Sequence, residues 1–429
     1  MKTIIKLIFL GIVVAVTWQY LENNNINVAE KIEGSAEWLK ARMKEFESTP
    51  PPVISQSDEP YETERPESES LTNAGSGDNY QAYNSIVTGS TWGDPAPSYQ
   101  ESAEEVPEEV SSDEAVEWVK AATKKYSPDS WYMLMEYDEL PARAEAKLTN
   151  GTTSESNKPA GTFSYLRGSG RTEIILSMST NVHEIGHGYY HQNVFRYANE
   201  NNLQLDWDNA DGFIYLSQGK SFYLSFPAKY LFPSAELKAS IPVSLRTFRF
   251  DTYIDGNTST QEDGVLGLLN EMHAYFLGSR FTYDMLDAYK SAEASESDGL
   301  IEWVSSISSE MTAFYEFDFF IKEYLFNMKS NYPDSYKQLK AYRNFSLAYA
   351  EVRKYYTDLI NSYQERVDSE IRKINASGSH EAHMEGVELW IKSTATGRSR
   401  GSDIFYEDRM KLLPVLESIR YNEIISDFL

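Results

Sequence analysis

The pattern of apolar and polar positions divides the 429-residue chain into parts of different character. An apolar run, Leu7–Val16, lies near the start, and residues 21–48 have the spacing of a short amphipathic helix. Residues 49–112 are rich in Pro, Ser and Glu, and too few of them are apolar to offset the entropy cost of ordering. Apolar positions recur regularly over residues 113–429. We therefore predict a disordered linker followed by one folded domain.

Most of the periodicity within residues 113–429 is helical. Helices are predicted over residues 113–125 and 264–279 and over most of 299–377. The long helical stretch is expected to break at Asn331-Tyr332-Pro333, because proline cannot continue a helix. A last helix is predicted near residues 404–416.

Strand signals are fewer and weaker. The Ile-Ile-Leu run within residues 171–178 predicts a strand directly before the segment 181–194. A second short strand is predicted at 387–393, and residues 206–255 are expected to be irregular or weakly sheet-like. The fold class that follows is α+β, mainly helical, with a small sheet before segment 181–194.

Charge is concentrated in the linker. The chain has a formal net charge of −26, and residues 47–114 hold sixteen acidic residues and one basic residue, Arg65. No basic stripe is present, so the sequence predicts no nucleic-acid partner and no attraction to anionic lipid. We interpret the acidic linker of residues 49–112 as a spacer.

Residues 1–20 read as a signal peptide or a membrane anchor. The apolar run is shorter than the roughly 20 residues that a full span needs. Val13 and Ala15 could satisfy a cleavage rule, whereas Trp18 and Tyr20 would suit a retained anchor at a membrane interface. Both readings predict that the rest of the chain is extracytoplasmic, either secreted or periplasmic or held at a membrane.

Three of the six histidines lie in residues 181–194, NVHEIGHGYYHQNV. On a helix, His183 and His187 point from one face and can bind the same ion. Glu184 lies about 100° round the axis, close enough to take a proton from a water on that ion. His191 lies about 12 Å from His183 along the axis, so we expect it outside the ligand set.

This H-E-x-x-H arrangement is typical of zinc metallopeptidases. The chain has no cysteine, which leaves histidine and carboxylate as the expected ligands of Zn²⁺. Gly186 and Gly188 each cost about 1 kcal/mol in a helix relative to alanine. We interpret them as allowing close approach of a partner helix or a substrate.

A third ligand is expected from the apolar helix at residues 264–279, GVLGLLNEMHAYFLGS. Glu271 is an acidic residue within an apolar sequence. An ionised carboxylate in an apolar environment is costly unless it binds a metal or a cation. Zn²⁺ is one partner for it. The alternative is a buried ion pair with one of three arginines, Arg246, Arg249 or Arg280.

The Asn270-Glu271 pair with Ala274-Tyr275 resembles the second motif of gluzincins, the zincins whose third ligand is a helix glutamate. Thermolysin-like peptidases and aminopeptidases with an N-E-x-x-A type helix are similar. The resemblance covers two short segments and implies a zincin-like catalytic domain over residues 113–429. It implies that His183, His187 and Glu271 bind Zn²⁺ and that Glu184 is the general base.

The chain departs from the gluzincin pattern in two ways. The gap between the two motifs is long, and Tyr275 stands where thermolysin-like enzymes have an aspartate that orients a histidine ligand. Asn270 or Asp263 is expected to orient the imidazole instead.

Other polar side chains are weaker candidates. Tyr253 is our candidate donor to an oxyanion, with His273 and His191 as alternatives. His380 and His383 form a second histidine pair, which we expect in a solvated loop without metal.

The sequence therefore predicts a zinc-dependent hydrolase, with a peptide or protein as substrate. Two alternatives stay open at this point. One is a noncatalytic extracytoplasmic surface or binding protein with a structural metal site. The other is a zinc amidase that acts on cell-wall peptides.

Overall fold

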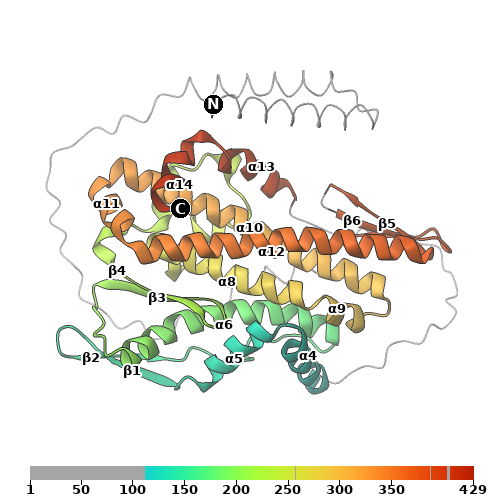
Figure 1. Ribbon diagram of the computed structural model, residues 1–429, viewed down its shortest axis with the longest axis horizontal. Helices are drawn as coiled ribbons and strands as arrows, with labels where there is room; N and C mark the ends of the chain where they lie inside the picture. The colour runs from blue at the N-terminus through green and yellow to red at the C-terminus, as the bar shows by residue number, and fades with distance from the viewer. Residues whose placement is uncertain (1–111, 257, 387, 403–405) are drawn as a thin grey trace, which may run out of the picture. The chain divides into compact units, whose positions relative to one another are not determined.

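The computed structural model describes residues 112–429 except 257, 387 and 403–405 (Figure 1). The helices are α4 (Ser112–Tyr126), α5 (Pro128–Glu139), α6 (Arg171–Glu200), α7 (Phe250–Tyr253), α8 (Gly264–Asp284), α9 (Leu286–Ala292), α10 (Glu296–Asn331), α11 (Pro333–Ala341), α12 (Arg343–Ser377), α13 (Tyr406–Leu416) and α14 (Asn422–Phe428). The strands are β1 (Arg143–Lys147), β2 (Thr153–Asn157), β3 (Asn209–Ser217), β4 (Lys220–Pro227), β5 (His380–Glu385), β6 (Glu388–Ser393) and β7 (Ser399–Gly401).

The predictions for residues 1–20, 21–48 and 49–111 lie outside the described residues, and residue 112 already begins α4. The mainly helical α+β class is confirmed for the described part of the chain, where long helices dominate and every sheet is small and antiparallel. Within that part, every helix is either too short or too polar to cross a lipid bilayer.

Helix α8 forms the centre of the core. It packs against α6, α10 and α12, which run alongside it in Figure 1. Buried residues occupy almost its whole circumference, as expected for a helix enclosed by others. Glu271 therefore lies in the middle of the hydrophobic core and not on a polar helix face.

The predicted strand at residues 171–178 is wrong, because these residues form the first two turns of α6. Ile174, Met178, Val182 and Ile185 are buried at spacings of four, four and three residues, which is the period of a helix and not of a strand. No glycine or proline separates this run from His183, so the helix continues into the histidine motif as one element of 30 residues.

A small sheet does precede α6 in the chain, but it is the β1–β2 hairpin. The β3–β4 hairpin follows α6 and packs on it, and α8 contacts β3 from the other side. Short 3₁₀ turns and α7 fill residues 228–261, which agrees with the prediction of irregular and weakly sheet-like structure there. The sheet content before and after α6 is thus limited to two hairpins.

The C-terminal part follows the sequence prediction closely. The break between α10 and α11 falls at Tyr332, and β6 lies within the predicted strand. The helix predicted near residues 404–416 is α13, and α14 was not predicted. His380 and His383 lie on strand β5 and not in a loop, and their odd spacing directs them to opposite faces.

The two glycines of the histidine motif are sites of close approach, as predicted. A Cβ atom on Gly186 would lie 2.9 Å from Leu277 Cδ1 on α8, and one on Gly188 would lie 2.9 Å from the Tyr137 hydroxyl. Gly186 therefore leaves room for the Leu277 side chain between α6 and α8, and Tyr137 fills the space beside Gly188.

We predict that Gly186→Leu lowers the free energy of unfolding by about 1–3 kcal/mol, because the added side chain overpacks the α6–α8 contact. Urea denaturation of the full chain measures this change. The matched control is Glu200→Leu at the exposed end of α6, which should change stability by less than about 0.5 kcal/mol. Equal urea midpoints for Gly186→Leu and wild type would contradict the packing constraint.

A candidate metal centre between two helices

Helix α6 presents two imidazoles toward the same point. The Nε2 atoms of His183 and His187 lie 3.2 Å apart. The side chains retain 12% and 19% of their exposure, so they stand at an opening of the core and not deep inside it. The four-residue spacing inferred from the sequence thus brings both nitrogens to one place.

Helix α8 supplies the third group. Glu271 Oε2 lies 3.4 Å from His187 Nε2 and 3.9 Å from His183 Nε2. Ligand atoms from all three side chains lie within 4.8 Å of one another. A tetrahedral ion with bonds of about 2.0–2.2 Å holds its ligand atoms about 3.3–3.6 Å apart, so the spacing fits one cation.

The environment of Glu271 supports the same reading. Its Oε2 atom is buried and has no hydrogen-bond partner in the described part of the chain. The arginines considered as alternatives contact other groups: Arg249 pairs with Glu316, Arg280 with Asp129, and Arg246 donates to the carbonyls of Ile241 and Lys238. A bound cation would compensate the charge of the buried Glu271 carboxylate.

The electrostatics of the two histidines show that the site attracts positive charge. Burial disfavours the charged form of His187, but the Glu271 carboxylate outweighs it and raises the pKa of His187 to about 9. Burial, and then the charge on His187, hold the pKa of His183 well below its ordinary value. The protonated form of His187 is therefore favoured beside Glu271, whereas the protonated form of His183 is not. The site thus favours one positive charge, as expected for a site that binds a single ion.

Glu184 lies at the edge of this group. Its Oε1 atom is 3.9 Å from His183 Nε2, and it is not one of the clustered ligand groups. Burial raises the pKa of Glu184; His187 acts against the rise and Glu271 adds to it. A half-buried carboxylate with a raised pKa is a better proton acceptor than an exposed one.

Asn270 orients one of the imidazoles. Its Oδ1 atom lies 3.2 Å from His187 Nδ1, which directs Nε2 of that ring toward His183 and Glu271. Asp263, the other candidate, precedes α8 about two turns before Glu271 and forms no hydrogen bond with either histidine among the described residues. Of the two residues expected to orient an imidazole, Asn270 is thus the one that contacts a histidine of the site.

Tyr275 forms one wall of the site. Its ring packs edge-on against His183, with ring centroids 4.5 Å apart. Its hydroxyl lies 3.2 Å from the hydroxyl of Tyr253, the candidate oxyanion donor on α7. Burial and the nearby Glu271 carboxylate raise the pKa of Tyr253, so its hydroxyl keeps its proton and can donate it in a hydrogen bond.

A buried ion pair supports this wall. The Arg249 guanidinium lies 4.4 Å from the Tyr275 ring centroid, and the Arg249 backbone N–H donates to Glu316 Oε1 at 2.9 Å. Sequence reasoning missed the roles of Tyr275 and Glu316. Two signals were present: Tyr275 follows Glu271 by four residues, and Glu316 is an acidic residue within the aromatic run FYEFDFF.

The remaining histidines lie apart from the ligand group. His273 is fully buried, and its Nε2 lies 2.6 Å from the Tyr215 carbonyl oxygen on β3, so it is unsuited to donate to a substrate. His191 is exposed one turn beyond His187. His380 and His383 belong to β5, and neither joins a metal-binding group in the described part of the chain.

Comparison with known proteins adds no relative. No family model matches the chain, and neither does a curated protein or a solved structure. The interpretation of the site therefore rests on its geometry and on the two sequence motifs.

We predict that Glu271→Ala lowers zinc affinity by about tenfold or more, because the core loses the carboxylate that balances the cation. Competition with a chelator, together with native mass spectrometry, measures affinity and stoichiometry. Glu262→Ala, an exposed glutamate just before α8, is the matched control and should bind like wild type. Wild-type affinity in Glu271→Ala would exclude Glu271 as a ligand.

Proposed function

We propose that this protein is a zinc-dependent hydrolase, and specifically a peptidase. The observation that carries the proposal is the half-buried Glu184 carboxylate beside a group of three ligand side chains. Three protein ligands leave one position of a tetrahedral ion open for water or substrate, which is the arrangement of catalytic zinc sites.

Zn²⁺ bound at this site would polarise a substrate carbonyl and lower the pKa of a water molecule. Glu184 accepts a proton from that water molecule while the water oxygen attacks the carbonyl carbon. The same carboxyl then donates the proton to the amine nitrogen as the peptide bond breaks. Burial raises the pKa of Glu184, so this carboxylate accepts a proton more readily than an exposed one and can then hold it for transfer to the amine.

Tyr253 is the proposed donor to the oxyanion of the tetrahedral intermediate. Its hydroxyl is held 3.2 Å from that of Tyr275, whose ring contacts His183. A preorganised neutral donor beside the ligand group stabilises charge that develops only during the reaction. Tyr275 and Arg249 act as positioning residues for this hydroxyl.

A structural metal site is the less favoured function. Structural zinc sites use four protein ligands, whereas the clustered group in the described residues has three members. A cell-wall amidase would use the same chemistry on another amide. The proposed location outside the cytoplasm depends on residues 1–20, which lie outside the described part of the chain.

We predict that Glu184→Gln keeps bound zinc but lowers hydrolysis by about 10²-fold or more, because the amide cannot accept the proton of the water. Mass spectrometry of a proteome-derived peptide mixture measures cleavage, with and without chelator. Glu200→Gln at the exposed end of α6 is the control and should match wild type. Full activity in Glu184→Gln would remove the base assignment, and cleavage that persists in chelator would remove the metal from the reaction.

We predict that Tyr253→Phe lowers kcat by about 10²-fold with a small change in KM, because the lost hydrogen bond forms in the transition state. Steady-state kinetics on a peptide identified from the mixture gives both constants. Tyr230→Phe changes another half-buried tyrosine, on a turn after β4, and should leave kcat unchanged. An unchanged kcat in Tyr253→Phe would assign the oxyanion to another donor.

A further inference from the structure

A pocket of about 310 Å³ opens beside α6, close to the candidate metal centre. His191 lines it, and this residue follows His187 by four positions, so it lies on the same helix face about 6 Å further along the axis. A peptide held at the metal centre and extended along α6 would bring a neighbouring side chain to this pocket. The volume is at the small end of ligand pockets and suits one side chain.

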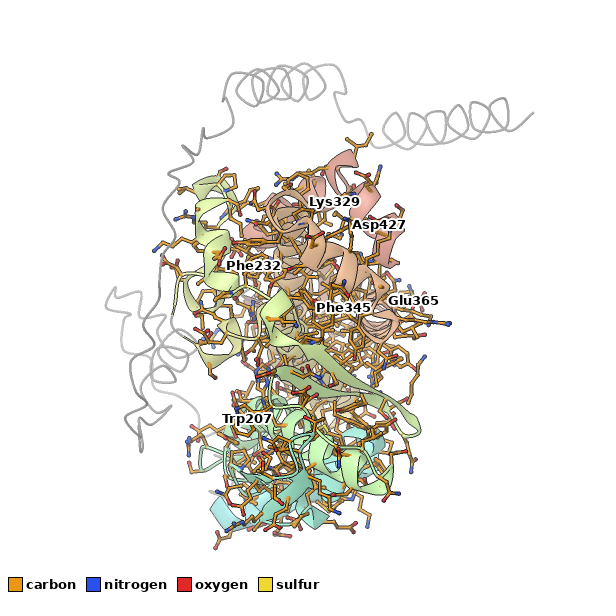
Figure 2. The ribbon with its side chains drawn as sticks, turned by 90° about the vertical axis from the view of Figure 1, so that its left-hand side faces the viewer. Trp207, Phe232, Lys329, Phe345, Glu365 and Asp427 are labelled. Carbon is orange, nitrogen blue, oxygen red and sulfur yellow. The ribbon has the colours of Figure 1, made fainter. Side chains whose placement is uncertain are left out.

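The far wall of the pocket is a short loop, residues 201–208, between α6 and β3. The loop is anchored to the first hairpin: Leu205 N donates to the Lys147 carbonyl, and Thr149 N donates to the Leu205 carbonyl, both at 2.9 Å. Trp207 follows this anchor and is 73% exposed. Figure 2 shows it near the end of the domain opposite Lys329 and Asp427. The Trp207 ring is exposed to solvent and its backbone is anchored, so the ring can pack against a ligand.

The lining combines apolar walls with negative charge. Val194, Phe195 and Trp207 contribute apolar surface, and Asp206 and Asp211 contribute carboxylates, while the described residues that line the pocket include no lysine or arginine. Burial raises the pKa of Asp211 to about 6, and the hydroxyl groups that donate hydrogen bonds to this carboxylate offset the rise only in part. A cation in the pocket would stabilise its ionised form.

We propose, on the basis of the proposed peptidase function, that this pocket binds a lysine or arginine side chain of the substrate about two residues from the cleaved bond. The aliphatic stem packs on Val194 and Phe195, the cationic head pairs with Asp206 and Asp211, and the Trp207 ring face lies against the cation. The occupant is chosen by charge complementarity, because a purely apolar side chain would leave both carboxylates without a counter-charge in the pocket.

The first test is the cleavage pattern of the full-length chain on the peptide mixture. Wild type should cut with lysine or arginine enriched at one fixed position from the broken bond. The double variant Asp206→Asn with Asp211→Asn should lose this enrichment by about tenfold, while cleavage of peptides that lack basic residues stays detectable. Asp208→Asn, an exposed acid of the same loop outside the lining, is the control and should keep the enrichment.

The second test is binding, which requires no hydrolysis. Chemical-shift titration of the zinc-loaded Glu184→Gln chain compares N-acetyl-arginine methylamide with the citrulline analogue, a neutral molecule of nearly the same shape. The arginine probe should bind at least about tenfold more tightly, and the two Asp→Asn changes should abolish the difference. Trp207→Ala, an exposed substitution that leaves folding intact, should weaken the arginine probe as well.

The two tests separate failure of the pocket from failure of the peptidase. Discrimination between the probes without any cleavage would support the pocket and overturn the proposed hydrolysis. Cleavage without basic enrichment, or enrichment and discrimination that survive in the double variant, would overturn the pocket assignment.

Discussion

The contact between α6 and α8 is the constraint on which the site depends. A Cβ atom at Gly186 would lie 2.9 Å from Leu277 Cδ1 and 3.9 Å from Ala274 Cα, so the glycine leaves the Leu277 side chain room within this contact. The imidazoles of His183 and His187 come from one helix and the Glu271 carboxylate from the other. Their ligand atoms lie within 4.8 Å of one another because the two helices pack against each other. A larger separation would leave two histidines at an opening and a carboxylate buried in a hydrophobic core, which is costly without a partner.

The core around this contact holds its charge in a specific way. Glu271 has mainly apolar neighbours on α8, and the buried Arg249 pairs with Glu316. Arg249 also stacks on Tyr275, whose ring packs against His183. Replacing a buried ion pair by apolar residues often costs little stability, so a role in holding the Tyr275 wall is a better reason for this pair than stability alone.

The sequence predicted which three side chains come together more securely than it predicted the elements that carry them. We chose His183 and His187 because two histidines at helical spacing can bind the same ion. We chose Glu271 because an acidic residue in an apolar helix needs a cation beside it. The strand predicted at residues 171–178 failed because Ile-Ile-Leu suits both a strand and a buried helix, and only packing against other elements decides between them. The meeting of Tyr275 with Tyr253 depends on tertiary packing between α8 and the turn at α7, which no local pattern encodes. The choice of Asn270 over Asp263 likewise needed the rotation of α8 relative to α6.

The groups with proposed roles follow one another along α6, and this order limits how a substrate can bind. Helix geometry places His183, His187 and His191 on one face at intervals of about 6 Å, with Glu184 turned toward the side of the first histidine. Consecutive residues of an extended peptide are about 3.3 Å apart, so two residues cover one such interval. A peptide lying along this face would place its scissile bond at the histidine pair and a side chain two or so residues away at the pocket beside His191. A single helix can therefore position the proposed base, two of the candidate metal ligands and the proposed specificity pocket in register with a peptide, while α8 contributes the carboxylate of the third candidate ligand.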